Sequence, residues 1–147
     1  MSKYFIGLAL TALMVASLLG CGSEKFKMAP VTGTVTLAGK PLEKVMVEFW
    51  PEAEGPRSIA VTDAARTFKL MTDDGKRQGA VVGAHKVVLK DVSILNDEIR
   101  GRAAADVDLS QGRKPRFSTK YSNAQTTMLT ETVQAGENNF NLEPIKF

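Results

Sequence analysis

Few side chains in this sequence are suited to chemistry. The chain has one cysteine, Cys21, and one histidine, His85. Structural zinc sites need several Cys or His ligands and a disulfide needs two thiols, so this composition argues against both. His85 could act as a general base or a metal ligand, but that work requires a positioned partner, and the sequence shows no such constellation. We expect His85 to be an aromatic-sized strand residue packed near the rim of the core.

Cys21 follows a segment with the layout of a secretory signal peptide. Lys3 is the only charged residue among the first twenty, and residues 4–19 are almost wholly apolar. A helix of these sixteen residues would reach about 24 Å, which is short of the ~30 Å hydrocarbon core. The length therefore disfavours a permanent membrane span. We expect residues 1–20 to be a cleaved signal peptide helix.

The end of this segment, Leu18-Leu19-Gly20-Cys21, resembles a bacterial lipobox. In that family the cysteine thiol receives a diacylglyceryl group, the signal is cut before the cysteine, and the new amine is acylated. The resemblance implies that Cys21 carries acyl chains such as palmitate. Leu19 is bulkier than the usual occupant of its position. The alternative is that Cys21 is a buried or free thiol of an exported protein.

Cleavage would leave residues 21–147 with no second cysteine, so the hydrophobic core alone would have to stabilise the fold. We expect residues 21–28 to be the lipidated N-terminus and a short polar tether, and residues 29–147 to be one domain. The 19 basic and 16 acidic residues form a mixed surface, which is not the footprint of a nucleic-acid-binding protein.

Short alternating segments dominate the expected domain. Apolar and polar residues alternate with a period of two, and Gly, Pro, Asp and Asn separate most of these runs. This pattern predicts an all-β fold of seven short strands, in which an antiparallel β-sandwich is favoured and a small barrel is the alternative. The expected strands cover residues 31–37, 45–50, 58–62, 67–71, 85–90, 126–134 and 139–142.

One long charged stretch, residues 91–115, interrupts the strand pattern and predicts a surface loop. Its two interpretations are a variable loop and a binding loop. The acidic residues lack the spacing of an EF-hand calcium loop, so a solvated acidic face is favoured. The basic residues could contact anionic lipid or wall polymer, although an ordinary charged loop is favoured. The acidic set is Asp97, Glu98, Asp106 and Asp108; the basic set is Arg100, Arg102, Arg113, Lys114 and Arg116.

Two aromatic residues, Trp50 and Tyr121, could stack on sugars, although one exposed aromatic ring is not a binding platform by itself. Tyr121 could instead make a hydrogen bond that stabilises the sandwich. The sequence contains no Gly-x-Ser-x-Gly nucleophile elbow and no glycine-rich phosphate loop. We therefore expect no catalytic residue, no metal site and no cofactor.

The strand region resembles carboxypeptidase-regulatory-like, transthyretin-like domains, and its ending resembles small planctomycete-type lipoproteins built on this domain. The resemblance covers most of residues 29–143 and implies a seven-stranded sandwich of prealbumin or immunoglobulin-like shape, usually a non-catalytic module. It is carried by the order of the segments 31–37 (VTGTVTL), 39–42 (GKPL), 45–49 (VMVEF), 62–63 (TD), 68–70 (FKL), 86–89 (KVVL) and 136–140 (GENNF).

Three positions depart from that family pattern. The turn after Thr62-Asp63 usually carries glycine, which accepts a positive φ, but Ala65-Arg66 stands there. His85 stands where an inward aromatic ring is usual. Alternation places Glu131 on the core face, where an unpaired carboxylate is costly. We hypothesise that Glu131 either turns outward at a bulge or pairs with His85.

These observations predict a lipid-anchored cell-envelope protein that faces the periplasm or the cell surface. Its sandwich would be a non-enzymatic structural or interaction module, held at the membrane by its lipid and contacting an envelope protein or polysaccharide through sheet edges or the 91–115 loop. The alternative is a carbohydrate- or small-ligand-binding accessory subunit of an envelope uptake system, and an undetected hydrolase is third.

Overall fold

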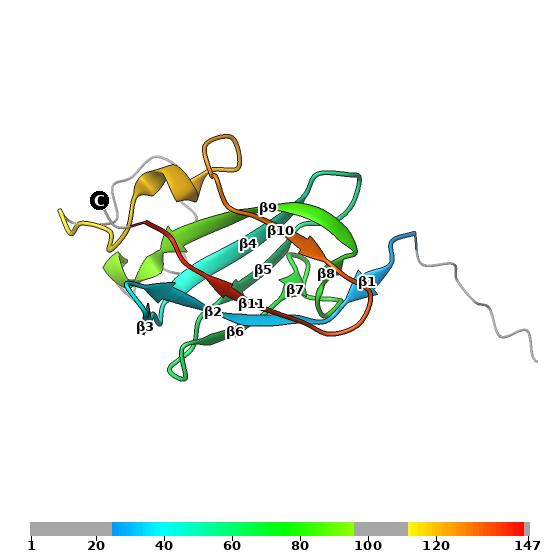
Figure 1. Ribbon diagram of the computed structural model, residues 1–147, viewed down its shortest axis with the longest axis horizontal. Coiled ribbons are helices and arrows are strands. Elements are labelled where there is room, and N and C mark those ends of the chain that lie inside the picture. The colour runs from blue at the N-terminus through cyan, green and yellow to red at the C-terminus, as the bar shows by residue number, and fades with distance from the viewer. Residues whose placement is uncertain (1–24, 96–111, 146–147) are drawn as a thin grey trace, which may run out of the picture.

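The computed structural model describes residues 25–95 and 112–145, which form an all-β fold (Figure 1). The expected signal peptide, Cys21 and residues 96–111 of the expected loop lie outside this part. Within it, the only helical elements are two short 3₁₀ helices, η1 Val92–Ile94 and η2 Thr119–Ser122. The strands are β1 Met28–Ala29, β2 Val31–Leu37, β3 Lys40–Pro41, β4 Val45–Pro51, β5 Ser58–Val61, β6 Thr67–Lys69, β7 Met71–Thr72, β8 Ala80–Val81, β9 Gly83–Asp91, β10 Thr130–Val133 and β11 Asn138–Leu142.

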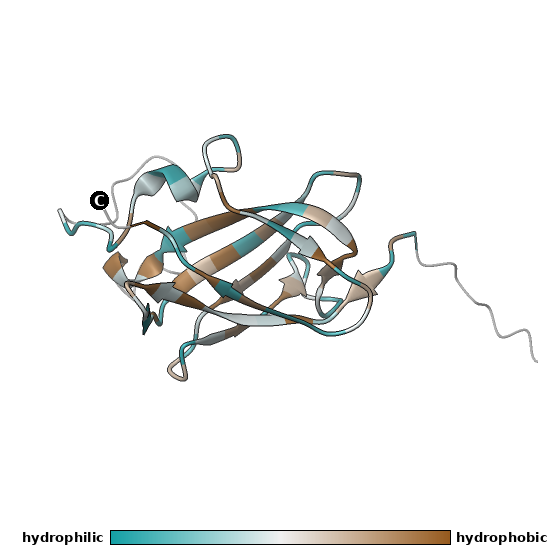
Figure 2. Ribbon diagram, viewed as in Figure 1, coloured by the Kyte–Doolittle hydropathy of each residue, from teal (hydrophilic) through white to brown (hydrophobic). Residues whose placement is uncertain are grey.

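Two sheets share one hydrophobic core. The larger has the strand order β10-β9-β4-β5-β7, and the smaller has the order β11-β2-β3 with β6 also paired to β2. Inward side chains of both sheets, including Val35 of β2, Val47 of β4 and Leu89 of β9, belong to the same buried cluster. The rings of Phe49 on β4 and Phe140 on β11 lie 5.7 Å apart and connect the two layers. Figure 2 shows the alternation of apolar and polar residues along these strands.

One strand pair differs from the expected antiparallel arrangement. β11 runs parallel to β2, in the register that places Phe140 opposite Gly33. Parallel neighbours need a long connection, and here almost the whole domain lies between the two strands. The buried amide of Asn138 orders the turn that leads from β10 to β11: its oxygen accepts from the Gln134 N–H at 2.9 Å, and its nitrogen donates to the carbonyls of Gln134 and Gly136 at 3.0 and 2.9 Å.

The strand expected over residues 67–71 is divided at Leu70 between the two sheets. β6 pairs with β2, whereas β7 pairs with β5 in the other sheet. Leu70 is fully buried, and its N–H donates to the carbonyl of Val31 at 3.0 Å. A uniform alternating pattern does not reveal such a crossing, because both halves bury every second residue in the same core.

The ends of the expected elements also differ in places. β10 is shorter than the expected 126–134 strand, and β9 begins at Gly83 rather than His85. The short pair of β1 and β8 was not expected from the sequence. Lys27, in the expected tether, is already held to the fold, because its carbonyl accepts from the Val82 N–H at 2.8 Å.

Gly33 at the centre of β2 permits close packing of three strands. A Cβ atom there would lie 2.1 Å from the Phe140 carbonyl oxygen and 2.7 Å from the Phe68 ring. The absence of a side chain at Gly33 therefore lets the β11 backbone approach β2 and lets the Phe68 ring of β6 pack over it.

The turn between β5 and β6 has an unusual backbone at Arg66, one of the positions that depart from the glycine of the resembled pattern. Arg66 takes a φ of 63°, the left-handed conformation that favours glycine. The Asp63 carbonyl accepts from the Arg66 N–H at 2.9 Å, and the Asp63 carboxylate accepts from the Thr67 N–H at 3.0 Å. The Asp63 carboxylate therefore stabilises this turn although Arg66, the fourth residue of the turn, is not glycine.

We predict that Arg66→Gly raises the free energy of unfolding by up to about 1 kcal/mol, because glycine removes the strain of a positive φ. Urea unfolding followed by the fluorescence of the single tryptophan measures the change. The matched control, Ala64→Gly, adds backbone freedom in the same turn without relieving strain, and should lower stability by about 0.5 kcal/mol. A loss of stability in Arg66→Gly as large as in the control would contradict the prediction.

Candidate functional site

His85 is a buried core residue, as expected. It lies on β9 with 1% of its surface exposed, and its ring centroid is 5.6 Å from that of Phe49. Its Nδ1 atom lies 2.9 Å from the Gly83 carbonyl oxygen, which fixes a proton on Nδ1. Its Nε2 atom is buried and has no hydrogen-bond partner among the residues that the structure describes. Burial lowers the pKa of His85 because it disfavours the charged imidazolium, against the opposing effects of the Gly83 carbonyl and Glu52.

Glu131 and His85 are opposite one another in the β10–β9 register. Side chains at directly opposed positions of an antiparallel pair lie on the same face of the sheet, so the expected inward alternation of Glu131 is present. No hydrogen bond or ion pair joins the two side chains in the described part of the chain. Burial raises the pKa of the half-buried Glu131 carboxyl. The pair is therefore adjacent in register without the proposed ion pair.

We predict that wild-type stability falls as the pH drops below the ordinary His pKa of 6.5, because the unfolded chain then binds a proton that the native imidazole resists. The slope from this one group can reach about 1.4 kcal/mol per pH unit. His85→Phe keeps a ring against Phe49 and should remove this part of the pH dependence. Urea unfolding at several pH values from about 5 to about 8, on both sides of the ordinary His pKa, measures this pH dependence.

Glu131→Gln is the control for that series. The raised pKa of Glu131 contributes with the opposite sign, since it penalises the folded state as the pH rises above the ordinary Glu value of 4.5. This variant should therefore be more stable than wild type at neutral pH and should keep the loss of stability below pH 6.5. If the stability of wild type and of His85→Phe depends on pH in the same way, His85 is not the group that causes the loss.

A second buried acid lies on the opposite face of the larger sheet. The Glu48 side chain on β4 is only 4% exposed and accepts hydrogen bonds from three side chains. These are Lys90 Nζ at 2.6 Å, Trp50 Nε1 at 2.8 Å and Arg57 Nη1 at 3.3 Å. This network was not predicted from the sequence, although the alternation of Met46, Glu48 and Trp50 places an acid beside the tryptophan on one face of the strand.

The Glu48 network fixes the position of the Trp50 side chain. The only polar atom of the indole is bonded to Glu48, and the Arg57 guanidinium lies 4.8 Å from the ring centroid. Trp50 nevertheless remains 38% exposed. Tyr121, the other aromatic residue considered for sugar stacking, is buried, and its hydroxyl accepts from the Ile145 N–H at 3.1 Å. Of the two, only Trp50 is available to a ligand.

A groove borders Trp50 on the outer face of the larger sheet. It consists of adjoining cavities of about 410 and 240 Å³ that share Trp50, Ala124 and Gln125. One wall is the segment from Ser122, the last residue of η2, to Thr127. It is bonded to β9 through Ser122 Oγ to the Leu89 carbonyl at 3.3 Å and Thr127 Oγ1 to the Val87 carbonyl at 2.6 Å. We call this the Trp50 groove; its remaining lining residues are Glu48, Pro51, Glu52, Lys86, Val88, Lys90, Ser122 and Asn123.

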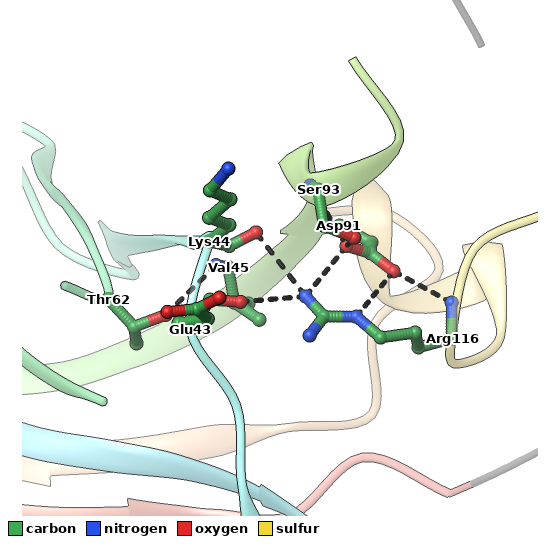
Figure 3. Close-up of polar contacts among 7 residues, drawn as sticks. All are labelled: Glu43, Lys44, Val45, Thr62, Asp91, Ser93 and Arg116. Atoms are coloured by element: carbon green, nitrogen blue, oxygen red, sulfur yellow. Dashed lines mark hydrogen bonds and ion pairs between the residues drawn. The ribbon is translucent and has the colours of Figure 1, made fainter. Parts of the chain in front are cut away.

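The third polar cluster lies at the base of the expected long loop (Figure 3). Arg116 binds the Asp91 carboxylate through Nε at 2.9 Å and Nη2 at 2.8 Å, and its backbone N–H donates to the same carboxylate at 2.7 Å. Ser93 Oγ donates to Asp91 at 2.6 Å, and Arg116 Nη2 reaches the Glu43 carbonyl at 2.8 Å. We call this cluster the loop clamp, because it brings the two ends of the 92–115 segment to one place beside the start of β4.

The Asp91 side chain in the loop clamp is fully buried. Burial by itself would raise the pKa of Asp91, but the hydrogen bonds from Arg116 and Ser93 outweigh it and hold the pKa below its ordinary value. The sequence analysis had assigned Arg116 to a loose basic cluster in the loop. Of the other charged residues considered there, Asp97, Glu98, Arg100, Arg102, Asp106 and Asp108 lie outside the described part of the chain.

We predict that Arg116→Met lowers the free energy of unfolding by about 3–5 kcal/mol, because it leaves the Asp91 carboxylate buried without its cation. Lys114→Met, which removes an exposed charge two residues away, should change stability by less than about 0.5 kcal/mol. The contribution of the clamp is present above the ordinary Asp pKa of 3.8 and is lost as the pH falls through the lower native value. Equal stability of the two variants in urea unfolding would refute this role.

Comparisons with protein-family models, with curated proteins and with solved structures give no match. Within residues 25–95 and 112–145, no helix is long and apolar enough to cross a membrane. The same residues contain no cluster of three or more His, Cys, Asp or Glu side chains that could hold a metal ion.

Proposed function

We propose that the chain is a bacterial cell-envelope lipoprotein, anchored through acyl chains on Cys21, that displays a non-catalytic β-sandwich as a structural or interaction module. The observation that carries the proposal is the position of Cys21 between a signal-like apolar segment and the first residues held to the fold. The first backbone hydrogen bond to the fold among the described residues is at Lys27, six residues after Cys21, where the Lys27 carbonyl accepts from the Val82 N–H.

The short tether has a physical consequence in this proposal. Six residues span at most about 20 Å when fully extended, so the domain would lie close against the membrane surface. Two or three acyl chains would hold it there firmly, because each buried methylene contributes about 0.8 kcal/mol. The module would contact partners within the envelope, facing the periplasm or the cell surface.

The sandwich in this proposal is of the transthyretin-like type, with seven principal strands. Its support is that two sheets share one core and that each of the seven expected segments contains strand residues. The parallel β11–β2 pair is a departure from a purely antiparallel sandwich. β10 and β11 lie at the ends of their sheets, so a partner strand could add to either one.

A non-catalytic role is supported by the engagement of the buried titratable groups in structure. The Glu48 and Asp91 carboxylates each accept several hydrogen bonds, and the His85 ring packs on Phe49. None of these groups combines access to solvent with a free reactive atom. The second candidate function, a carbohydrate- or small-ligand-binding accessory subunit of an uptake system, is favoured by the Trp50 groove.

We predict that Cys21→Ser releases the protein from membranes into the soluble envelope fraction and abolishes incorporation of a labelled palmitate analogue, because serine cannot form the thioether. Fractionation of cells that express each form at equal levels measures the release. Ser23→Ala, a small substitution in the tether, is the control and should stay membrane-bound. Retention of Cys21→Ser in the membrane fraction, without label, would overturn the anchor and leave the fold unaffected.

A further inference from the structure

We propose that the Trp50 groove binds one pyranose ring of a neutral oligosaccharide, with the sugar packed against the indole. This inference rests on the second candidate function and is independent of the lipid anchor. A sugar ring presents an apolar C–H face and a rim of hydroxyl groups, so its site needs one apolar surface and several uncommitted donors and acceptors. The Trp50 groove offers both.

The indole is positioned before any ligand arrives. Glu48 is nearly buried opposite Val88 on the outer face of the larger sheet. The cost of desolvating such an acid offsets most of the stability that its ion pairs supply. What the Glu48 network achieves is a fixed Trp50 ring, bonded at Nε1 and covered on one face by the Arg57 guanidinium, so the sugar would pack on the other face. An aromatic ring that is already immobilised loses little conformational freedom on stacking, which favours binding.

The polar lining of the groove is available for hydroxyl groups. The side chains of Lys86, Glu52 and Gln125 make no hydrogen bond or ion pair within the residues that the structure describes. They supply an ammonium donor, a carboxylate acceptor and an amide that is both. Their positions beside Trp50 in the 410 Å³ cavity place these groups around the indole. This volume lies in the range of small-molecule sites.

The charge of the groove selects a neutral ligand. Its lining contains two carboxylates, Glu48 and Glu52, and two ammonium groups, Lys86 and Lys90. Lys90 and Glu48 already pair at 2.6 Å, so the remaining charges of Lys86 and Glu52 offset one another. A nucleotide or an anionic polymer could also stack on Trp50, but its phosphate or carboxylate groups would meet Glu52 as well as Lys86.

The test is isothermal titration of the full chain in detergent with maltopentaose, cellopentaose and mannopentaose. We expect saturable binding of at least one of them, weakened about tenfold or more in Trp50→Ala and less in Trp50→Phe. Ala124→Leu, which fills the groove and leaves the indole in place, should weaken binding to a similar degree. Met128→Ala, which removes an exposed apolar side chain outside the groove, is the matched control and should bind as wild type does.

Circular dichroism and urea unfolding establish whether each variant is folded. If Trp50→Ala does not fold, the sugar affinity of Ala124→Leu decides the outcome. The inference is overturned if none of the three sugars binds up to its solubility limit, or if Trp50→Ala and Ala124→Leu bind as tightly as wild type. Binding of polygalacturonate alone, lost as salt is added, would also overturn it in favour of an anionic ligand. Cys21→Ser should bind sugar unchanged, so failure of the anchor and failure of the groove give different results.

Discussion

The structure depends on one apolar core held between two sheets, because no cysteine is present among the described residues to reinforce it with a disulfide. β4 and β9 are the central pair, and their inward residues Val45, Val47, Phe49, Val87 and Leu89 are fully buried. Burial of apolar surface is the main favourable term available to such a domain. The neighbouring strands and the loops that carry polar groups are built on this pair.

Polar groups at the margins of the core are tolerated under two different physical conditions. The carboxylates of Glu48 and Asp91 are tolerated because cationic and neutral donors surround them at hydrogen-bond distance. His85 Nε2 has no hydrogen-bond partner within residues 25–95 and 112–145, and burial instead favours the neutral imidazole. The hydrogen bonds to Glu48 and Asp91 fix the side chains on the outer face of the larger sheet and at the base of the loop. The burial of His85 instead makes the free energy of unfolding depend on pH.

The two carboxylate clusters have different consequences for recognition. The loop clamp joins segments distant in sequence and holds Asp91 and Arg116, which flank the 92–115 segment, beside the start of β4. The Glu48 network instead joins neighbours on adjacent strands and presents an immobilised indole beside a polar groove. In both, a buried acid is bound by an arginine, whose planar guanidinium bonds and packs in ways that a lysine ammonium cannot.

The sequence by itself determined the all-β class, β2 from Val31 to Leu37 and the burial of His85, because each depends on local alternation or on the apolar character of a single strand. The conformation of the turn at Arg66 stayed open at that level, because Ala65-Arg66 departs from the glycine of the resembled pattern without showing which backbone replaces it. Only the tertiary structure decided the parallel β11–β2 pair, the crossing at Leu70, the Asp91–Arg116 pair and the groove beside Trp50. These features join residues that are far apart in the chain or lie on different strands, so they depend on how the sheets pack and not on any local pattern.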